Sequence, residues 1–157
     1  MTAAELVQEL EQGYQGELTE ARATSDYDAW VGVPPEQVTR IAQHLRDTYP
    51  PLHLSTITGV HRGEKIEVIY HFIAAGVSLN LRAAVDVSSA TIDSITPLIP
   101  AAVLYEREVA DLLGQGRGRF GVRGEFFEDD HELVAAQTGH GVAFTHRRQQ
   151  PARDVDQ

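Results

Sequence analysis

Alternating apolar and polar residues dominate the middle of the chain and predict three consecutive strands. The three segments read LHLSTITGVH, KIEVIYHFIAA and VSLNLRAAVDV, with glycine-containing turns at Gly63 and Gly76 between them. Successive side chains of a strand point to opposite faces, so each segment has one apolar face and one more polar face, which in the third strand carries Arg82. The pattern predicts a meander over residues 52–87 with one face covered by other elements.

Apolar residues that recur every three to four positions predict helices on both sides of this meander. The clearest is PPEQVTRIAQHLRDTYPP, and TAAELVQELEQ begins with a capping box in which Thr2 and Glu5 satisfy free backbone N–H groups. The segment SATIDSITPLI is expected to form a short helix. A further helix begins at Pro100 and ends at Gly114 in PAAVLYEREVADLLG.

The segment ELTEARATSDYDAWVGV adds one or two strands around a turn at Ser25–Asp26. We therefore expect an α+β fold, with a mixed, largely antiparallel sheet and helices packed on one face.

Glycine and arginine mark a change of character after residue 114. The stretch GQGRGRFGVRGE has five glycines and three arginines, which is unsuited to a compact core. We expect one globular domain over residues 1–114, an extended partner-docking arm over 115–147, and a disordered tail over 148–157.

The chain is acidic and contains no cysteine. Its net charge of −10 over 157 residues argues against nucleic acid as a partner, because binding to phosphates needs clustered cations. Without cysteine the chain offers no thiolate ligands for zinc or an iron–sulfur cluster. No apolar run approaches the roughly 18 residues of a membrane span, and the N-terminus lacks the pattern of a signal peptide. We expect a soluble domain that meets a membrane only peripherally, on the cytoplasmic side.

No motif in the sequence describes an active site. The seven histidines lack a ligand spacing such as HExxH, and neither a GxSxG elbow nor a P-loop occurs. We expect no catalytic, cofactor-binding or metal site in this chain. An independent enzyme that uses the histidines is the competing hypothesis, and it requires stoichiometric metal in the purified protein.

The helix that begins at Pro100 carries four charges within six residues, Glu106 to Asp111. Helical spacing places Ala102, Tyr105, Val109, Leu112 and Leu113 in its predicted core stripe. The charges then form either a solvated acidic face or a face that pairs with another subunit. We favour the interpretation that this face docks on another subunit. The main candidate partner contacts are Glu106, Arg107, Glu108 and Asp111. The second group of candidates is Arg82, Arg117, Arg119 and Arg123.

The segment EREVADLLG resembles the ErEvyDmfGi signature of the 30 kDa subunit of NADH:quinone oxidoreductase, respiratory complex I. Upstream, LHLSTITGV, IEVIYHF, VSLNLRAAVD and ITPLIPAAVLYEREV resemble the family's strands and its approach to the signature helix, in the same order. The resemblance covers residues 50–114 and extends to the related subunit of energy-converting membrane-bound [NiFe] hydrogenases. Beyond it, the family's His-Pro-Asp-Leu-Arg segment is missing, since the chain reads GRGRFGVRGEFFEDDHELV. This departure favours a divergent, hydrogenase-type relative.

The resemblance implies a non-catalytic subunit that binds no redox cofactor itself. Its expected partners are the large (49 kDa or [NiFe]-hydrogenase-like) subunit and the iron–sulfur subunits, so that iron–sulfur clusters, and a [NiFe] centre in the hydrogenase type, belong to partner chains. The expected role is to brace the large subunit of a membrane-anchored oxidoreductase that couples electron transfer to ion translocation. The alternative is a free-standing binding module that keeps the fold without the complex. Electron donor, electron acceptor and transported ion stay open.

Overall fold

The computed structural model describes residues 1–113, 121–123, 134–138 and 141–145. In chain order the elements are α1 (Ala3–Gly13), β1 (Glu20–Ser25), β2 (Asp28–Val33), η1 (Pro35–Gln37), α2 (Val38–Thr48), β3 (His53–Arg62), β4 (Lys65–Ala74), β5 (Val77–Asp86), η2 (Val87–Ser89), β6 (Thr91–Asp93), α3 (Ala102–Leu113), β7 (Gly121–Arg123), β8 (Val134–Thr138) and β9 (Gly141–Thr145).

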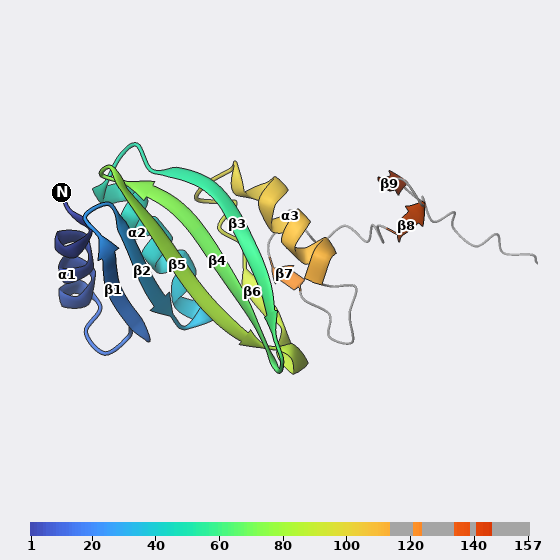
Figure 1. Cartoon of the computed structure of the whole chain (residues 1–157), viewed down its shortest axis with the longest axis horizontal. Coiled ribbons are helices and arrows are strands. Elements are labelled where there is room, and N and C mark those ends of the chain that lie inside the picture. The colour runs from blue at the N-terminus through green and yellow to red at the C-terminus, as the bar shows by residue number, and fades with distance from the viewer. Residues whose placement is uncertain (114–120, 124–133, 139–140, 146–157) are drawn as a thin grey trace, which may run out of the picture.

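Five strands form the main sheet, in the order β1-β2-β5-β4-β3 (Figure 1). The β2–β5 pair is parallel and the other three pairs are antiparallel. The predicted meander is present as β3, β4 and β5, and the predicted turn at Ser25–Asp26 joins β1 to β2. The α+β class with a mixed, largely antiparallel sheet is confirmed.

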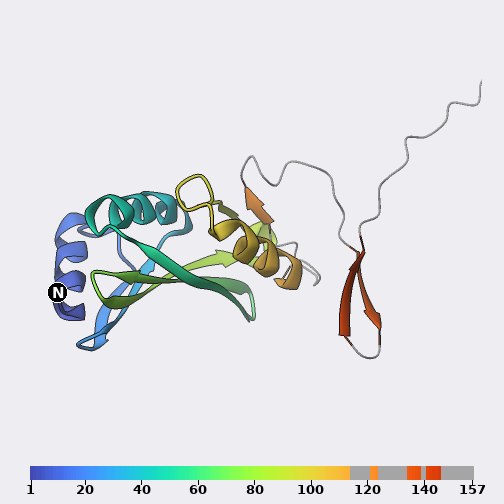
Figure 2. The same ribbon diagram turned by 90° about the horizontal axis from the view of Figure 1, so that it is seen from above.

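One face of this sheet forms the core. The alternating residues of β4 and β5 that the sequence assigns to the apolar face are buried, and they pack with the apolar stripes of α1 and α2. Figure 2 shows α1 and α2 together on one side of the strands. The stripe of α2 comprises Val38, Ile41, Ala42 and Leu45, as its period predicts. The opposite face of the sheet, the open face, includes Trp30, Glu67, His71 and Arg82, which are half-buried.

The first helix begins as predicted. The Thr2 hydroxyl accepts from the backbone N–H of Glu5 at 3.3 Å, while the Glu5 carboxylate accepts from the N–H of Thr2 at 2.7 Å. This reciprocal capping box satisfies two N–H groups that the helix itself leaves free.

The prediction of a short helix in SATIDSITPLI is wrong. The segment instead begins at the last residue of η2 and contains the short strand β6, followed by turns. Strand β6 pairs in parallel with β7, from Thr91 opposite Gly121 to Asp93 opposite Arg123. Pairing with a distant segment satisfies the backbone here, so the helix-like spacing of Ile92, Ile95 and Ile99 does not decide the local structure.

A short segment beyond residue 114, where the sequence predicts the arm to begin, packs with the core. This segment is strand β7, in which Val122 is 9% exposed and belongs to the hydrophobic core. The glycine- and arginine-rich composition around Val122 gives no sign of its burial. Further along, β8 and β9 form an antiparallel hairpin, from Val134 opposite Thr145 to Thr138 opposite Gly141. The predicted tail over 148–157 lies outside the described residues.

Candidate partner-binding site

The inward face of α3 carries a buried carboxylate. Glu106 is only 2% exposed, and the helix places it between Ala102 and Val109, which are both buried. Its Oε1 accepts from the backbone N–H of Ile95 at 2.7 Å. Its Oε2 accepts from the hydroxyl of Ser94 at 2.6 Å and from that of Thr96 at 2.8 Å. Three donors from one turn thus surround a charged acceptor, which is the arrangement that makes a buried carboxylate tolerable.

This arrangement links three parts of the chain. The Ser94 hydroxyl also accepts from the N–H of Thr96 at 3.0 Å, and the N–H of Ser94 donates to the carbonyl of Arg123 at 2.7 Å. Glu106 therefore ties α3 to the 94–96 turn, and through that turn to β7. Tyr70 is also buried, and burial together with the nearby Glu106 charge raises the pKa of its phenol.

The structure gives Glu106 an internal role, whereas the sequence suggests an outward contact for it. The reason is geometric. Glu106 lies four residues after Ala102 and three before Val109, so it faces the core despite its charge. Of the predicted core stripe, only Leu112 is wrong, because it is 72% exposed, whereas the other four residues are buried or half-buried.

Close approach to β3 fixes how α3 lies. A Cβ atom added to Gly59 would meet Val109 Cγ1 at 2.8 Å and Leu113 Cδ1 closer still. Real Cβ atoms do not make contacts this short, so a side chain at position 59 would force the Val109 and Leu113 side chains to move. Figure 1 shows α3 beside β3 at one end of the sheet.

The outward face of α3, defined here as Leu104, Arg107, Glu108, Asp111 and Leu112, combines exposed leucines with charges. Leu104 is 69% exposed and Leu112 is 72% exposed, and Glu108 lies between them at four-residue spacing. Arg107 and Glu108 are exposed and Asp111 is half-buried. Single exposed leucines are ordinary, and here two of them lie on one helical face beside charges of both signs.

Asp111 is the charged residue of this face that the isolated chain accommodates least well. Burial raises the pKa of its carboxyl, and the positive charge of Arg107 lowers it in part. The anionic form of Asp111 is thus disfavoured in the isolated chain, and an additional cation nearby would favour it.

A groove lies between α3 and β3. It has a volume of about 190 Å³ and is lined by Thr56, Ile57, Thr58, Gly59, Glu108, Val109, Leu112 and Leu113. Its residues overlap the outward face of α3 at Glu108 and Leu112. Strand β3 is an edge of the sheet, so one side of its backbone has no strand partner among the described residues.

Arg82 belongs to a series of charges that crosses the open face of the sheet. Its guanidinium contacts the carboxylates of Glu20 and, at 3.7 Å, Glu67. The series continues to Arg22, which contacts Glu20 at 2.7 Å, and to Arg62, which contacts Glu67 at 3.4 Å. Arg82 is about one-third exposed. Its described contacts are internal, so its predicted role in partner binding stays a prediction.

A network of neutral and acidic polar groups crosses the same face. Asn80 is 5% exposed and donates to the Asp28 carboxylate at 3.0 Å and to the carbonyl of Ala29 at 3.1 Å. The side-chain oxygen of Asn80 lies 2.7 Å from His71 Nδ1. Because this oxygen can only accept a hydrogen bond, Nδ1 carries the hydrogen that is donated to it. The other ring nitrogen, His71 Nε2, lies 2.9 Å from the hydroxyl of Thr58. The sequence gives no indication of this network, because its members lie on different strands.

The same network holds a second hydroxyl donor, Thr24 of β1. It donates to the Asp28 carboxylate, and this hydrogen bond is the main cause of the lowered pKa of Asp28. The network therefore connects all five strands of the sheet, from β1 to β3.

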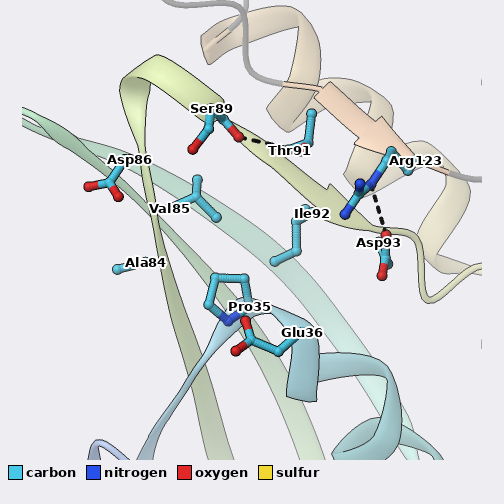
Figure 3. A pocket seen from close by; sticks show the side chains of 10 residues that line it. All are labelled: Pro35, Glu36, Ala84, Val85, Asp86, Ser89, Thr91, Ile92, Asp93 and Arg123. Carbon is cyan, nitrogen blue, oxygen red and sulfur yellow. Dashed lines mark hydrogen bonds and ion pairs between the residues drawn. The ribbon is translucent and has the colours of Figure 1, made fainter.

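Arg123 lines a pocket of about 280 Å³ between η1, the end of β5, β6 and β7 (Figure 3). Its guanidinium contacts the Asp93 carboxylate at 3.0 Å, and Glu36 and Asp86 are the other carboxylates of the lining. Thr91 donates to the carbonyl of Ser89 at 3.4 Å. No histidine occurs among the described residues that line the pocket, so it contains no pairing of a hydroxyl nucleophile with an imidazole base.

Two of the predicted partner contacts, Arg117 and Arg119, lie outside the described residues. Among the residues that are described, no three His, Cys, Asp or Glu side chains gather as a metal site would require. Within the same part of the chain, no helix is both long and apolar enough to cross a bilayer.

Comparison with known proteins identifies the family. Residues 31–115, more than half of the chain, match the family model described as "Respiratory-chain NADH dehydrogenase, 30 Kd subunit". The chain belongs to this family. The matched region begins within β2 and includes β3, β4, β5 and the whole of α3, and therefore both faces of the helix described above.

Two curated relatives come from bacterial NADH-quinone oxidoreductases. The chain is 35% identical over 95 residues to the C subunit of that enzyme from Roseiflexus sp. (strain RS-1), covering 55% of this chain and 54% of the relative. It is 30% identical over 89 residues to the C subunit from Methylobacterium sp. (strain 4-46), covering 52% and 41%. The chain thus spans about half the length of these relatives.

Likenesses to two solved structures show the fold. The first structure is that of the membrane-bound sulfane sulfur reductase, an archaeal respiratory membrane complex. One of its chains is similar to this chain with a TM-score of 0.67 and 21% sequence identity, and the match covers 83% of this chain and 76% of that one. The other is to the trypsin-resistant fragment (1-134) of Nqo5, with a TM-score of 0.60, 23% identity and coverage of 71% and 92%.

Proposed function

We propose that this chain is a non-catalytic subunit in the hydrophilic arm of a complex I-like membrane oxidoreductase. It binds and braces the large subunit, of the quinone-reducing or the [NiFe]-hydrogenase type, and iron–sulfur clusters reside in neighbouring subunits. The chain lies peripherally on the cytoplasmic side of the membrane. Membership of the 30 kDa family supports the assignment.

The outward face of α3 is the observation that carries the proposal. Leu104 and Leu112 expose apolar surface that a partner would remove from water, at roughly 25 cal/mol per Å². Arg107 and Glu108 provide opposite charges on the same face, which would fix the register of the partner. The raised pKa of Asp111 fits this role, because a partner cation would relieve its unfavourable charge.

The inner face of α3 supports the proposal indirectly. Glu106 attaches the helix to the 94–96 turn by hydrogen bonds, and α3 packs closely against β3 at Gly59. A surface held in place loses little conformational entropy when it binds. The backbone that carries the leucines and charges of the outward face is therefore already in place for a partner.

Affinity purification of the tagged chain from gently solubilised membranes of the native host tests the proposal. We expect mass spectrometry to identify a large subunit and iron–sulfur subunits in stoichiometric amounts. Cysteines at [NiFe] ligand spacing in that large subunit would assign the hydrogenase type, and their absence the quinone type. Recovery of the chain alone would contradict the proposal and favour the free-standing module.

A further inference from the structure

We propose that the groove between α3 and β3 receives an aliphatic or aromatic side chain of the partner subunit, next to which the partner carries a lysine or arginine. The inference rests on the proposed function and adds the chemistry of the contact. It goes beyond the outward face of α3, because half of the groove is made by β3.

The residues that line the groove indicate that its occupant is apolar. Ile57, Val109 and Leu113 supply apolar surface, and the exposed Leu112 extends it toward solvent. Thr56 and Thr58 line the β3 side, and the Thr58 hydroxyl lies 2.9 Å from His71 Nε2, so that hydroxyl is already paired and does not require a polar occupant. An apolar side chain fits such a lining better than a charged or amide one.

The volume of the groove indicates that its occupant is a single side chain and not a free small molecule. The groove has a volume of about 190 Å³. Pockets for drug-sized ligands occupy about 300–1,000 Å³ and enclose most of the ligand. The groove is therefore suited to one inserted side chain, with the rest of the partner lying over Leu112 and along the outer edge of β3.

The acidic residues at the groove favour a positively charged partner residue next to the inserted side chain. Glu108 is an exposed residue of the groove lining, and the chain as a whole carries a net charge of −10. A cation beside the inserted side chain would meet Glu108 and would also approach the half-buried Asp111, which lies three residues further along α3. A second copy of this chain would instead bring a similarly acidic surface, which argues against a homodimer at this face.

Obstructing the rim of the groove tests the inference without altering α3. Thr56→Trp places a large side chain at an exposed position of β3 that lines the groove, and His53→Trp places the same side chain at an exposed position of that strand outside the groove. We expect Thr56→Trp to lower recovery of the large subunit at least tenfold in the affinity purification, and His53→Trp to leave it unchanged. Equal recovery with both variants would overturn the groove assignment while leaving the proposed function in place. If even the wild-type chain recovers no large subunit, the proposed function itself fails.

A charge variant keeps the test decisive if the tryptophan disturbs folding. Glu108→Lys reverses the charge of an exposed side chain, and Glu11→Lys, at an exposed position of α1, is its control. We expect Glu108→Lys to lower recovery at least tenfold at low salt, and less at high salt because salt screens the pair. Wild-type recovery with Glu108→Lys would overturn the predicted partner cation.

Cross-linking identifies the occupant directly. The chain has no cysteine, so Thr56→Cys introduces a unique thiol for a photo-activated cross-linker. We expect the cross-linked peptide to come from the large subunit and to contain an apolar residue beside lysine or arginine. A peptide without either cation, or one from a second copy of this chain, would contradict the inference.

Discussion

The two faces of α3 use acidic residues in different ways. On the inner face, Glu106 is surrounded by three hydrogen-bond donors of the 94–96 turn and is 2% exposed. On the outer face, Glu108 is exposed beside two exposed leucines. Two residues apart in sequence, these carboxylates point about 200° apart around the helix. Charge density alone therefore does not indicate a binding surface, and each charge must be assigned from its surroundings.

This contrast predicts that the inner face contributes stability and the outer face contributes binding. Substitutions on the inner face should lower the free energy of unfolding of the chain by itself. Substitutions on the outer face should leave that free energy almost unchanged and affect only recovery of the partner.

Loss of the inner carboxylate is the largest expected effect. Glu106→Ala leaves the Ile95 N–H and two hydroxyls without their acceptor in a buried site, at a cost of about 1–3 kcal/mol for each group left unsatisfied. On that basis we expect a loss of at least about 3 kcal/mol in urea unfolding. Glu106→Gln keeps one carbonyl for the Ile95 N–H and should cost less than half as much. A loss below about 1 kcal/mol for the alanine variant, the lower bound for a single unsatisfied group, would contradict the role of Glu106 as an internal tie.

A medium effect is expected from the polar network on the open face of the sheet. Asn80→Ala removes the donor to Asp28 and to the Ala29 carbonyl and the acceptor for His71, at a cost of about 2 kcal/mol. Urea unfolding measures this loss, with Ser55→Ala at an exposed position of β3 as the control. If both variants unfold at the same urea concentration, the network contributes nothing to stability.

The smallest expected effect is a gain in stability, in contrast to the losses expected for the two preceding variants. Burial raises the pKa of Asp111, so the folded chain holds this proton more tightly than the unfolded chain. The charged form then costs stability above the folded-state pKa, and the cost disappears below the unfolded pKa of about 3.9. Asp111→Asn should therefore stabilise the isolated chain by less than about 0.5 kcal/mol at pH 7, and by nothing near pH 3. Thermal unfolding at both pH values measures the difference, and a loss of stability at pH 7 would show that Asp111 is a support rather than a binding residue.

Much of the fold could be predicted because local periodicity and burial agree. The alternation in KIEVIYHFIAA and VSLNLRAAVDV matches the buried faces of β4 and β5, and the spacing of Val38, Ile41 and Leu45 matches α2. These elements bury an apolar face against one continuous core, so pattern and structure follow from the same cause.

The rest depends on contacts between distant segments. Strand β6 has helix-like spacing in the sequence, and its pairing with β7 joins residues about 30 positions apart, which no local pattern reveals. Glu106 has a charge that suggests solvent, and the donors that make its burial tolerable lie on a separate turn.

The predicted partner contacts divide in the same way. Arg107, Glu108 and Asp111 lie together on the outward face of α3, because helical spacing alone decides where they point. Arg82 and Arg123 are engaged in ion pairs elsewhere, with carboxylates that are distant in the sequence.

Charge reversal at Arg107 tests the central claim most directly, namely that the outer face of α3 binds the partner while the inner face holds the fold. The Arg107 side chain is exposed, so Arg107→Glu should leave the melting temperature of the isolated chain within about 2 °C of wild type. In affinity purification from solubilised membranes the same variant should lose the large subunit at least tenfold, since reversing a charge at an interface costs about 2 kcal/mol or more. A variant that unfolds, or one that is folded and recovers the large subunit at the wild-type level, would contradict the account.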